Sequence, residues 1–280
     1  MQRTTGVSIA MAVGSAAIVA PILLSIHLAW IQGLDNEENQ VRYSARDVLR
    51  RSEETRDQIA VGIQELRRAN LPACSPGEID LMRRVDLNSS YIQAVARIQG
   101  NNLACTSLGT TSPIPIGPPM LTTENGAVER LNLSLPIAGG EPLDVVSLNG
   151  YAFLVNPSLP VDTKTEGPGI SLSLFVPSSL SHAQLARSGS NLRPEWFRSV
   201  SKGGEATFVS GGYVVCLVRS ADADLAAVAA APITYVTRRV AWFAALFVPI
   251  GLACGLVLAW AVVYLTRRSL SASSAMRAAA

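Results

Sequence analysis

Two of the four cysteines stand beside hydroxyl residues, and these two stretches carry the residue types best suited to covalent chemistry. Cys74 precedes Ser75 in PACSPGE. Cys105 precedes Thr106 and Ser107 in NNLACTSLG. Three roles compete for such a thiol: a nucleophile, one half of a disulfide, or a small apolar core residue. A nucleophilic thiol needs a nearby base, and neither stretch contains a histidine, so a nucleophilic Cys105 is disfavoured.

Other catalytic patterns are sparse. The histidines are His27 and His182, and no cysteines are spaced closely enough for a zinc site, so neither a metal site nor a cofactor is predicted. Residues 199–202, SVSK, match the Ser-x-x-Lys pattern of acyl enzymes, but the accompanying Ser-Asp-Asn and Lys-Thr-Gly motifs are missing. An outer-face enzyme built on Ser199, Lys202 and His182 is therefore the least favoured hypothesis. No catalytic residue is predicted.

Hydropathy identifies two elements of the chain, which are two long apolar runs. Residues 6–31 and 240–265 contain no Asp, Glu, Lys or Arg, and they consist mainly of Ala, Val, Ile and Leu. Each run exceeds the roughly 20 residues needed to span a hydrocarbon core. A backbone in lipid must satisfy its own hydrogen bonds, so both runs are predicted to be transmembrane helices. The first is too long for the apolar region of a cleaved signal peptide.

Charge sets the expected orientation and excludes one class of partner. The net charge of +2 gives no electrostatic case for nucleic-acid binding. Arg3 precedes the first span, and Arg267 and Arg268 follow the second, so both termini are expected in the cytoplasm. The expected location is the inner (cytoplasmic) membrane. The segments are a cytoplasmic N-terminus (1–5), a first span (6–31), a periplasmic domain (32–239), a second span (240–265) and a cytoplasmic tail (266–280).

The first half of the outer domain shows three local signals. Residues 34–70 are highly charged with apolar residues at helical spacing, which predicts a long helix leaving the membrane. Ser75, Pro76 and Glu78 form a capping-box pattern that predicts the start of a short helix. YIQAVARI and LACTSL flank the turn residues QGNN, which predicts a β-hairpin.

The second half is rich in strand patterns. The predicted strands are ERLNLSLPI, YAFLVN, ISLSLFV, EATFVS and YVVCLVRS, and the alternation in ISLSLFV predicts a half-buried strand. SADADLAAVAAA is predicted to be helical, with Pro232 interrupting the approach to the second span. The predicted fold class is α+β: an extracytoplasmic mixed domain with a long N-terminal helix, a short helix and an antiparallel sheet, between two transmembrane helices.

Disulfides persist outside the cytoplasm, so the outer cysteines are candidates for pairing. Three pairings are open among Cys74, Cys105 and Cys216, and the short helix and hairpin favour Cys74 with Cys105. In the chain-entropy model that loop would contribute roughly 3–4 kcal/mol. Cys216, on a strand, and Cys254, in the second span, are interpreted as packing residues.

The hydroxyls of the two motifs are assigned a local role. Thr106 and Ser107 are expected to satisfy backbone groups around the bridge rather than to act as catalysts, and Ser75 is expected to cap the short helix.

The stretch from Cys74 to Gly109 resembles the CSS-motif domain, the outer sensor region of bacterial membrane-bound cyclic di-GMP phosphodiesterases. The order of spans, helices and hairpin agrees, although Thr106 stands where the family has serine. The resemblance implies that Cys74 and Cys105 form the family's disulfide, whereas Cys216 has no counterpart. Family members continue into a cytoplasmic phosphodiesterase domain with a Glu-Ala-Leu signature. Residues 1–280 lack that signature, so no phosphodiesterase activity is expected from them.

Two functional hypotheses follow. The first is a transmembrane sensor, responsive to redox state or to a ligand, in which the Cys74–Cys105 disulfide controls a cytoplasmic output. Its expected partners are a second copy of the chain in a homodimer, periplasmic thiol-disulfide oxidoreductases, and a cytoplasmic output domain or partner protein. The alternative is a periplasmic small-ligand-binding module with a pocket formed by the strands from Leu131 to Ser220. In that case the disulfide would be purely structural.

Overall fold

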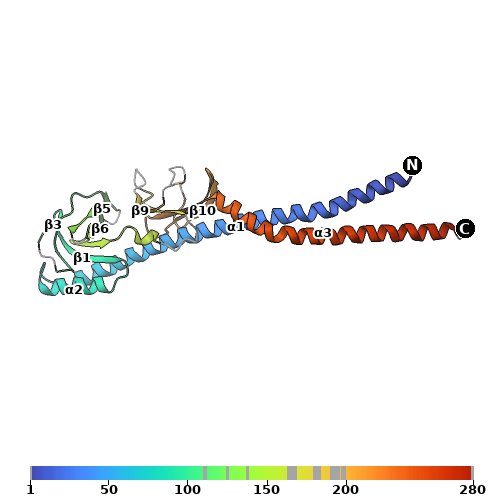
Figure 1. Ribbon diagram of the computed structural model, residues 1–280. Coiled ribbons are helices and arrows are strands. Elements are labelled where there is room, and N and C mark those ends of the chain that lie inside the picture. The colour runs from blue at the N-terminus through green and yellow to red at the C-terminus, as the bar shows by residue number, and fades with distance from the viewer. Residues whose placement is uncertain are drawn as a thin grey trace. The chain divides into compact units, whose positions relative to one another are not determined.

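Helix α1, Gln2–Ala69, is the longest element of the chain (Figure 1). It is longer than the helix predicted for residues 34–70, because the apolar run at 6–31 continues into the charged segment without a break. The computed structural model describes residues 2–109, 112–123, 126–136, 139–162, 169–178, 184–189, 196 and 200–278.

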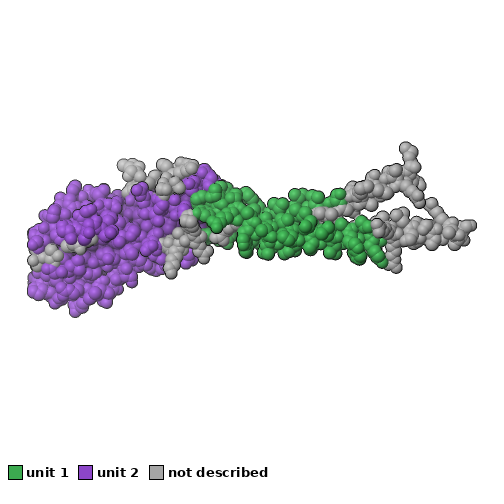
Figure 2. Space-filling view, in the orientation of Figure 1, with its two compact units in different colours: residues 1–40, 232–280 green, residues 41–231 purple. Residues whose placement is uncertain are grey.

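The chain divides into two units, one of residues 1–40 with 232–280 and one of residues 41–231 (Figure 2). In the first unit, helix α3, Ile233–Ala278, packs closely on α1. A Cβ atom added to Gly251 would lie 2.5 Å from Ser25 Oγ and 3.0 Å from the carbonyl oxygen of Pro21. Gly251 therefore allows the two helices to approach closely, as small residues do between helices in membranes.

The apolar part of α3 meets the requirements of a membrane span. Residues 233–261 have a mean hydropathy of 2.2 and are long enough to cross a bilayer. The corresponding role of residues 6–31 stays a prediction, as do the limits of the five predicted segments.

The second unit contains a seven-stranded antiparallel sheet in the order β3-β2-β1-β7-β6-β5-β4, which curls upon itself (Figure 1). Its strands are β1 Ile92–Gln99, β2 Asn102–Thr106, β3 Ile114–Pro115, β4 Leu121–Thr122, β5 Val128–Ser134, β6 Pro142–Leu148 and β7 Tyr151–Val155. The predicted hairpin is confirmed as β1 and β2, with Gln99 opposite Asn102. Strand β6 was not predicted, and it pairs with both β5 and β7.

The same unit contains a second, five-stranded sheet in the order β10-β11-β12-β8-β9, where a single sheet was predicted. Its strands are β8 Ser171–Phe175, β9 Gln184–Ser188, β10 Glu205–Ser210, β11 Tyr213–Arg219 and β12 Ala226–Pro232. A short 3-10 helix, η2 Leu159–Val161, lies in the connection from β7 to β8. All five residues of β8 are buried, not half of them as the alternation predicted, because β8 is an inner strand of the sheet.

The helical prediction for SADADLAAVAAA is wrong. Its second half forms the central strand β12, in which Ala226–Ala231 are all buried. Alanine favours helices through its small entropic cost, but that preference is below 1 kcal/mol per residue. Pairing with β11 and β8 satisfies the backbone on both sides of the strand and overrides this preference. Helix α3 begins at Ile233, immediately after Pro232.

The α+β fold class is confirmed, with a long N-terminal helix and antiparallel sheets. Helix α1 contacts both sheets of the second unit. Ile59, Ile63 and Leu66 are buried against strands of the first sheet. Arg42 forms an ion pair with Glu205 of the second sheet, with Nε and Oε1 2.6 Å apart.

Candidate functional site at the Cys74–Cys105 disulfide

Cys74 and Cys105 form a disulfide with their Cα atoms 5.8 Å apart. Cys74 lies in the turn between α1 and helix α2, Pro76–Leu87, with a left-handed φ of +56°. Cys105 lies in β2 and is 1% exposed. Cys216 and Cys254 are free. Burial raises the pKa of the Cys216 thiol, which keeps it protonated and unreactive at neutral pH.

Ser75 caps the first turn of α2. Its Oγ accepts the backbone N–H of Glu78 at 3.2 Å, and its own N–H donates to the carbonyl of Pro72 at 3.1 Å. The predicted capping box is present in a shifted form: the carboxylate of Glu78 accepts the N–H of Cys74 at 2.6 Å rather than that of Ser75. The cap is therefore tied directly to the disulfide.

Glu78 connects the disulfide segment to the sheet. Its side chain is 1% exposed, and Oε1 accepts the hydroxyl of Tyr151 at 2.9 Å. The same oxygen lies 3.6 Å from Nη1 of Arg97, whose guanidinium stands 4.7 Å from the ring centre of Tyr151. Burial, followed by the hydrogen bond to Glu78, raises the pKa of Tyr151, so the phenol stays protonated as a donor. One buried carboxylate thus joins α2, β1, β7 and the bridge.

Ser107 makes the matching connection on the other side of α2. Its hydroxyl donates to Oδ2 of Asp86 at 2.9 Å and accepts the backbone N–H of Val95 at 3.1 Å. Burial raises the pKa of Asp86, and the hydrogen bond from Ser107 opposes that shift. The preceding Thr106 is fully buried. The cysteine motifs therefore hold both ends of α2 against the β1–β2 hairpin.

Ser107→Ala is expected to lower the free energy of unfolding by about 1–3 kcal/mol, because it leaves the buried N–H of Val95 without its side-chain acceptor and Asp86 without its donor. Urea unfolding of the full chain in detergent, followed by tryptophan fluorescence, measures the loss. Ser112→Ala, at an exposed serine, is the matched control and should change stability by less than about 0.5 kcal/mol. Equal losses in the two variants would contradict the assignment.

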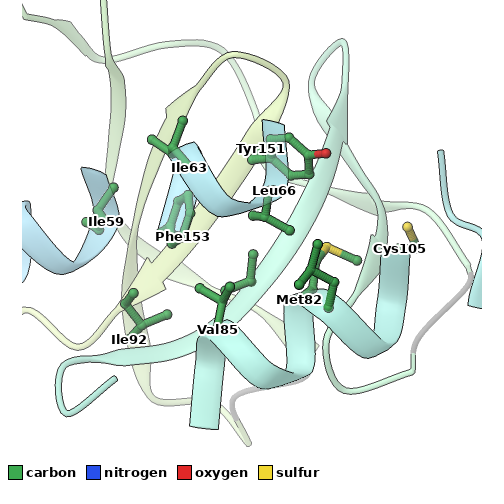
Figure 3. Close-up of a cluster of buried hydrophobic side chains, with 11 residues drawn as sticks. Ile59, Ile63, Leu66, Met82, Val85, Ile92, Cys105, Tyr151 and Phe153 are labelled. Atoms are coloured by element: carbon green, nitrogen blue, oxygen red, sulfur yellow. The ribbon is translucent and has the colours of Figure 1, made fainter. Parts of the chain in front are cut away.

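Cys105 lies in an apolar cluster that includes the C-terminal part of α1 (Figure 3), and its disulfide partner Cys74 packs against this cluster. Cys105 lies in the same buried cluster as Leu66 of α1 and Met82 of α2. Contact is close at Gly62, where an added Cβ would lie 2.7 Å from Cγ1 of Val85 and 3.1 Å from Cε1 of Phe153. Because the packing is this close, a displacement of α2 or β2 is expected to displace α1 as well.

The bridge also bears on metal binding. The ligand atoms of Cys74, Glu78 and Cys105 all lie within 4.8 Å of one another. In the oxidised chain both sulfurs are bonded to each other, so neither is a thiolate ligand. Glu78 is also occupied by its hydrogen bonds. The oxidised arrangement is that of a structural or redox-active bridge.

A second candidate site is a cavity of about 450 Å³ within residues 41–231. It lies between α1, the β4–β6 part of the first sheet, and the β8–β9 part of the second. Some of its lining comes from the predicted pocket strands between Leu131 and Ser220. The rest comes from α1, from Tyr91, from residues 121–123, 127 and 129, and from residues 222–225.

The sequence identified Cys74, Ser75, Cys105, Thr106 and Ser107, and the structure brings all five to the α2–hairpin junction. Other participants there were not predicted as site residues. The sequence marked Glu78 only as a cap residue of the short helix, and this was the one local signal for any of these additional site residues. Nothing in the local sequence marks the remaining participants, which are Asp86, Arg97 and Tyr151. Of the residues of the disfavoured enzyme hypothesis, Lys202 is exposed, and His182 and Ser199 lie outside the described residues.

Comparison by sequence gives one family. The model of the CSS motif domain associated with EAL matches residues 37–241. No curated protein matches the sequence of this chain.

Comparison by structure gives sensor domains. The extracellular domain of rpHK1S-Z16, named as a histidine kinase, is 16% identical, with a TM-score of 0.46 over 75% of this chain and 98% of that one. The Campylobacter jejuni chemoreceptor Tlp3 sensory domain with isoleucine bound is 9% identical, with a TM-score of 0.40 over 76% of this chain and 98% of that one. The Tlp3 ligand-binding domain in complex with L-valine is 8% identical, with a TM-score of 0.43 over 76% of this chain and 98% of that one. No ligand of this chain follows from these likenesses.

Proposed function

The chain belongs to the family of CSS-motif domains associated with EAL, and from this membership we propose that it is the sensor region of an inner-membrane signalling protein. Residues 32–239 form its periplasmic domain. Two transmembrane helices, 6–31 and 240–265, anchor this domain and leave both termini in the cytoplasm. The output is a cytoplasmic domain or partner protein of the cyclic di-GMP phosphodiesterase type, in keeping with the family's association with EAL.

The signal in this proposal is the state of the Cys74–Cys105 bridge. Oxidation removes two electrons and two protons from the thiols, and a periplasmic thiol-disulfide oxidoreductase accepts them by disulfide exchange. Reduction reverses the step and frees β2 from the start of α2. The observation that carries the proposal is the burial of Cys105 in one cluster with Ile63 and Leu66 of α1. Helix α1 is continuous from Gln2 to Ala69, so a shift at the cluster is passed to the apolar run at 6–31.

A photo-crosslinking experiment tests this coupling. A photoreactive amino acid is placed at Leu24 or Leu256, both exposed apolar positions, in a chain with Cys216→Ala and Cys254→Ala. If the protein is a homodimer switched by the bridge, crosslinks between copies are expected to differ between oxidised and reduced samples. The matched control carries Cys74→Ser and Cys105→Ser, and its pattern should not respond to reductant. Identical crosslinking patterns in oxidised and reduced samples would contradict the proposed redox switch.

A second candidate function is favoured by the cavity of about 450 Å³. In this case the domain senses a small ligand and the disulfide is purely structural. A ligand-induced rise in melting temperature that persists in the Cys74→Ala, Cys105→Ala double variant would support this candidate, and the lack of any such rise in the natural chain would contradict it.

A further inference from the structure

The cavity is built on the part of the first sheet that the helices leave open. One face of this sheet is covered at β1 and β7 by α1 and α2. Register places Val146 opposite Phe153 and Leu148 opposite Tyr151, so these four side chains share that face. Val146 and Leu148 are only partly buried against the helices, and both line the cavity. The cavity wall is therefore a continuation of the hydrophobic core.

Two carboxylates lie on this apolar wall. Glu129 stands opposite Val146, and Asp144 is two positions along the same strand from Val146, so the two carboxylates are diagonal neighbours on one face. Asp144 Oδ1 accepts the backbone N–H of Asn132 at 2.8 Å. Within the part of the chain that the structure describes, no hydrogen bond or ion pair engages the carboxylate of Glu129.

The electrostatics of this pair disfavour two negative charges. Burial raises the pKa of Asp144 to about 6. Burial, and then the charge of Asp144, raises the pKa of Glu129 to about 7. Asp144 therefore ionises first, and its charge opposes ionisation of Glu129. A cation between them would stabilise both charges and lower both pKa values.

The rest of the lining adds negative charge and apolar surface. Its other charged residues are Arg56, Asp222 and Asp224. Arg56 is paired with Asp57 at 3.1 Å and Asp224 with Arg219 at 3.3 Å. Most of the lining is aliphatic, with Ile59, Leu131, Leu159, Leu174 and Val176 among its members. A volume of about 450 Å³ falls in the usual range for small-molecule sites.

We propose that this cavity binds an amphipathic organic cation, a protonated amine attached to an aliphatic or aromatic group, with Glu129 and Asp144 as its counter-ions. The ammonium donates to the two carboxylates while the apolar part displaces water from the wall at Val146 and Leu148. The inference rests on the proposal that the domain is a sensor, and it names the class of ligand that the cavity accepts. Glu129 and Asp144 are distinct from the residues around the disulfide, although the cavity lining shares Ile59 and Ile63 with the cluster that contains Cys105.

The titratable groups that line the cavity predict the pH dependence. They are Arg56, Tyr91, Glu129, Asp144, Asp222 and Asp224. Glu129 and Asp144 have raised pKa values, so both become fully ionised only above about pH 7. Affinity for a cation is therefore expected to increase as the pH rises from about 5 to about 8 and to level off above it.

Calorimetry on the full chain in nanodiscs of zwitterionic lipid tests the proposal. The probes are cyclohexylammonium, cyclohexanol and cyclohexanecarboxylate, which share a ring and differ in charge; empty nanodiscs correct for partition into lipid. We expect the cation to bind most tightly and the anion least. Glu129→Gln with Asp144→Asn should lower cation affinity by roughly tenfold or more and should abolish its pH dependence. The same double variant should be at least as stable to unfolding as the natural chain, because it removes the repulsion between the carboxylates of Glu129 and Asp144.

The matched control is Glu141→Gln with Asp80→Asn, which neutralises two exposed carboxylates outside the cavity and should leave affinity unchanged. If the double cavity variant does not fold, Glu129→Gln alone carries the test. Equal binding of cation and alcohol, tighter binding of the anion, or no binding would each overturn the proposed ligand class. The crosslinking measurement reports separately on the sensor proposal, so a failed ligand class with redox-dependent crosslinks leaves the redox switch standing.

Discussion

Replacement of Glu78 by alanine is expected to lower the free energy of unfolding by about 3–5 kcal/mol. The buried carboxylate accepts the N–H of Cys74 and the hydroxyl of Tyr151 and neutralises Arg97, so its removal leaves two donors and a charge without their partner. Urea unfolding of the oxidised full chain measures this loss. Glu78→Gln keeps an acceptor oxygen and should cost less than alanine.

Asp80→Ala is the matched control for Glu78. Asp80 lies on the same helix, is exposed, and is paired with Arg83 at 2.9 Å. Exposed pairs of this kind contribute at most about 1 kcal/mol, so the control should be nearly as stable as the natural chain. A loss in Glu78→Ala no larger than that in Asp80→Ala would show that Glu78 does not organise the site.

Removal of the disulfide by Cys74→Ala with Cys105→Ala is expected to lower the free energy of unfolding by about 3–4 kcal/mol, since the bridge closes a loop with a sequence separation of 31. Either single replacement should cost a similar amount, because each breaks the same bond. Denaturant unfolding of the full chain, with and without reductant, provides the measurement. Reductant should have no effect on the double variant.

Cys254→Ala serves as the control for thiol removal, because Cys254 is free and exposed. The comparison also separates a structural bridge from a switch. If the reduced domain unfolds, the disulfide is needed for the fold and the switch is excluded. A reduced domain that stays folded, with its fluorescence spectrum changed and its crosslinks altered, is the result that the switch requires.

The effects of Glu78 and of the bridge are expected to couple. Because the carboxylate holds the backbone of Cys74, a variant without the disulfide gives that segment more freedom and weakens the hold of Glu78 on it. The loss for Glu78→Ala should therefore be smaller in the Cys74→Ala, Cys105→Ala background than in the natural chain.

Local signals in the sequence were sufficient for the elements around the disulfide. The Ser75-Pro76 start of α2, the hairpin turn at QGNN and the end of α1 near residue 70 each depend on neighbouring residues, and the structure has all three. The resemblance of residues 74–109 to a known domain then selected one of three cysteine pairings. These features are local because caps and turns are satisfied within a few residues.

Two strands, β6 and β12, were not predicted from the sequence because their formation depends on pairing with strands elsewhere in the chain. The alanine-rich β12 became a strand because β8 and β11 offered it two ladders, one of them with a strand more than fifty positions earlier in the chain. Strand β6 was missed for a similar reason, since its partners define it more than its own pattern does. Strand formation depends on such non-local partners more than helix formation does.

The sequence by itself determined the apolar and charged segments, the short capped helix, the hairpin and the two cysteine motifs, because their signals lie within a few residues of one another. Only the tertiary structure decided what surrounds them. It brought Glu78 to Tyr151, 73 positions away, and placed Glu129 beside Asp144 on a cavity wall. The free energies of these buried groups depend on desolvation and on partners that come together only after the sheets have formed.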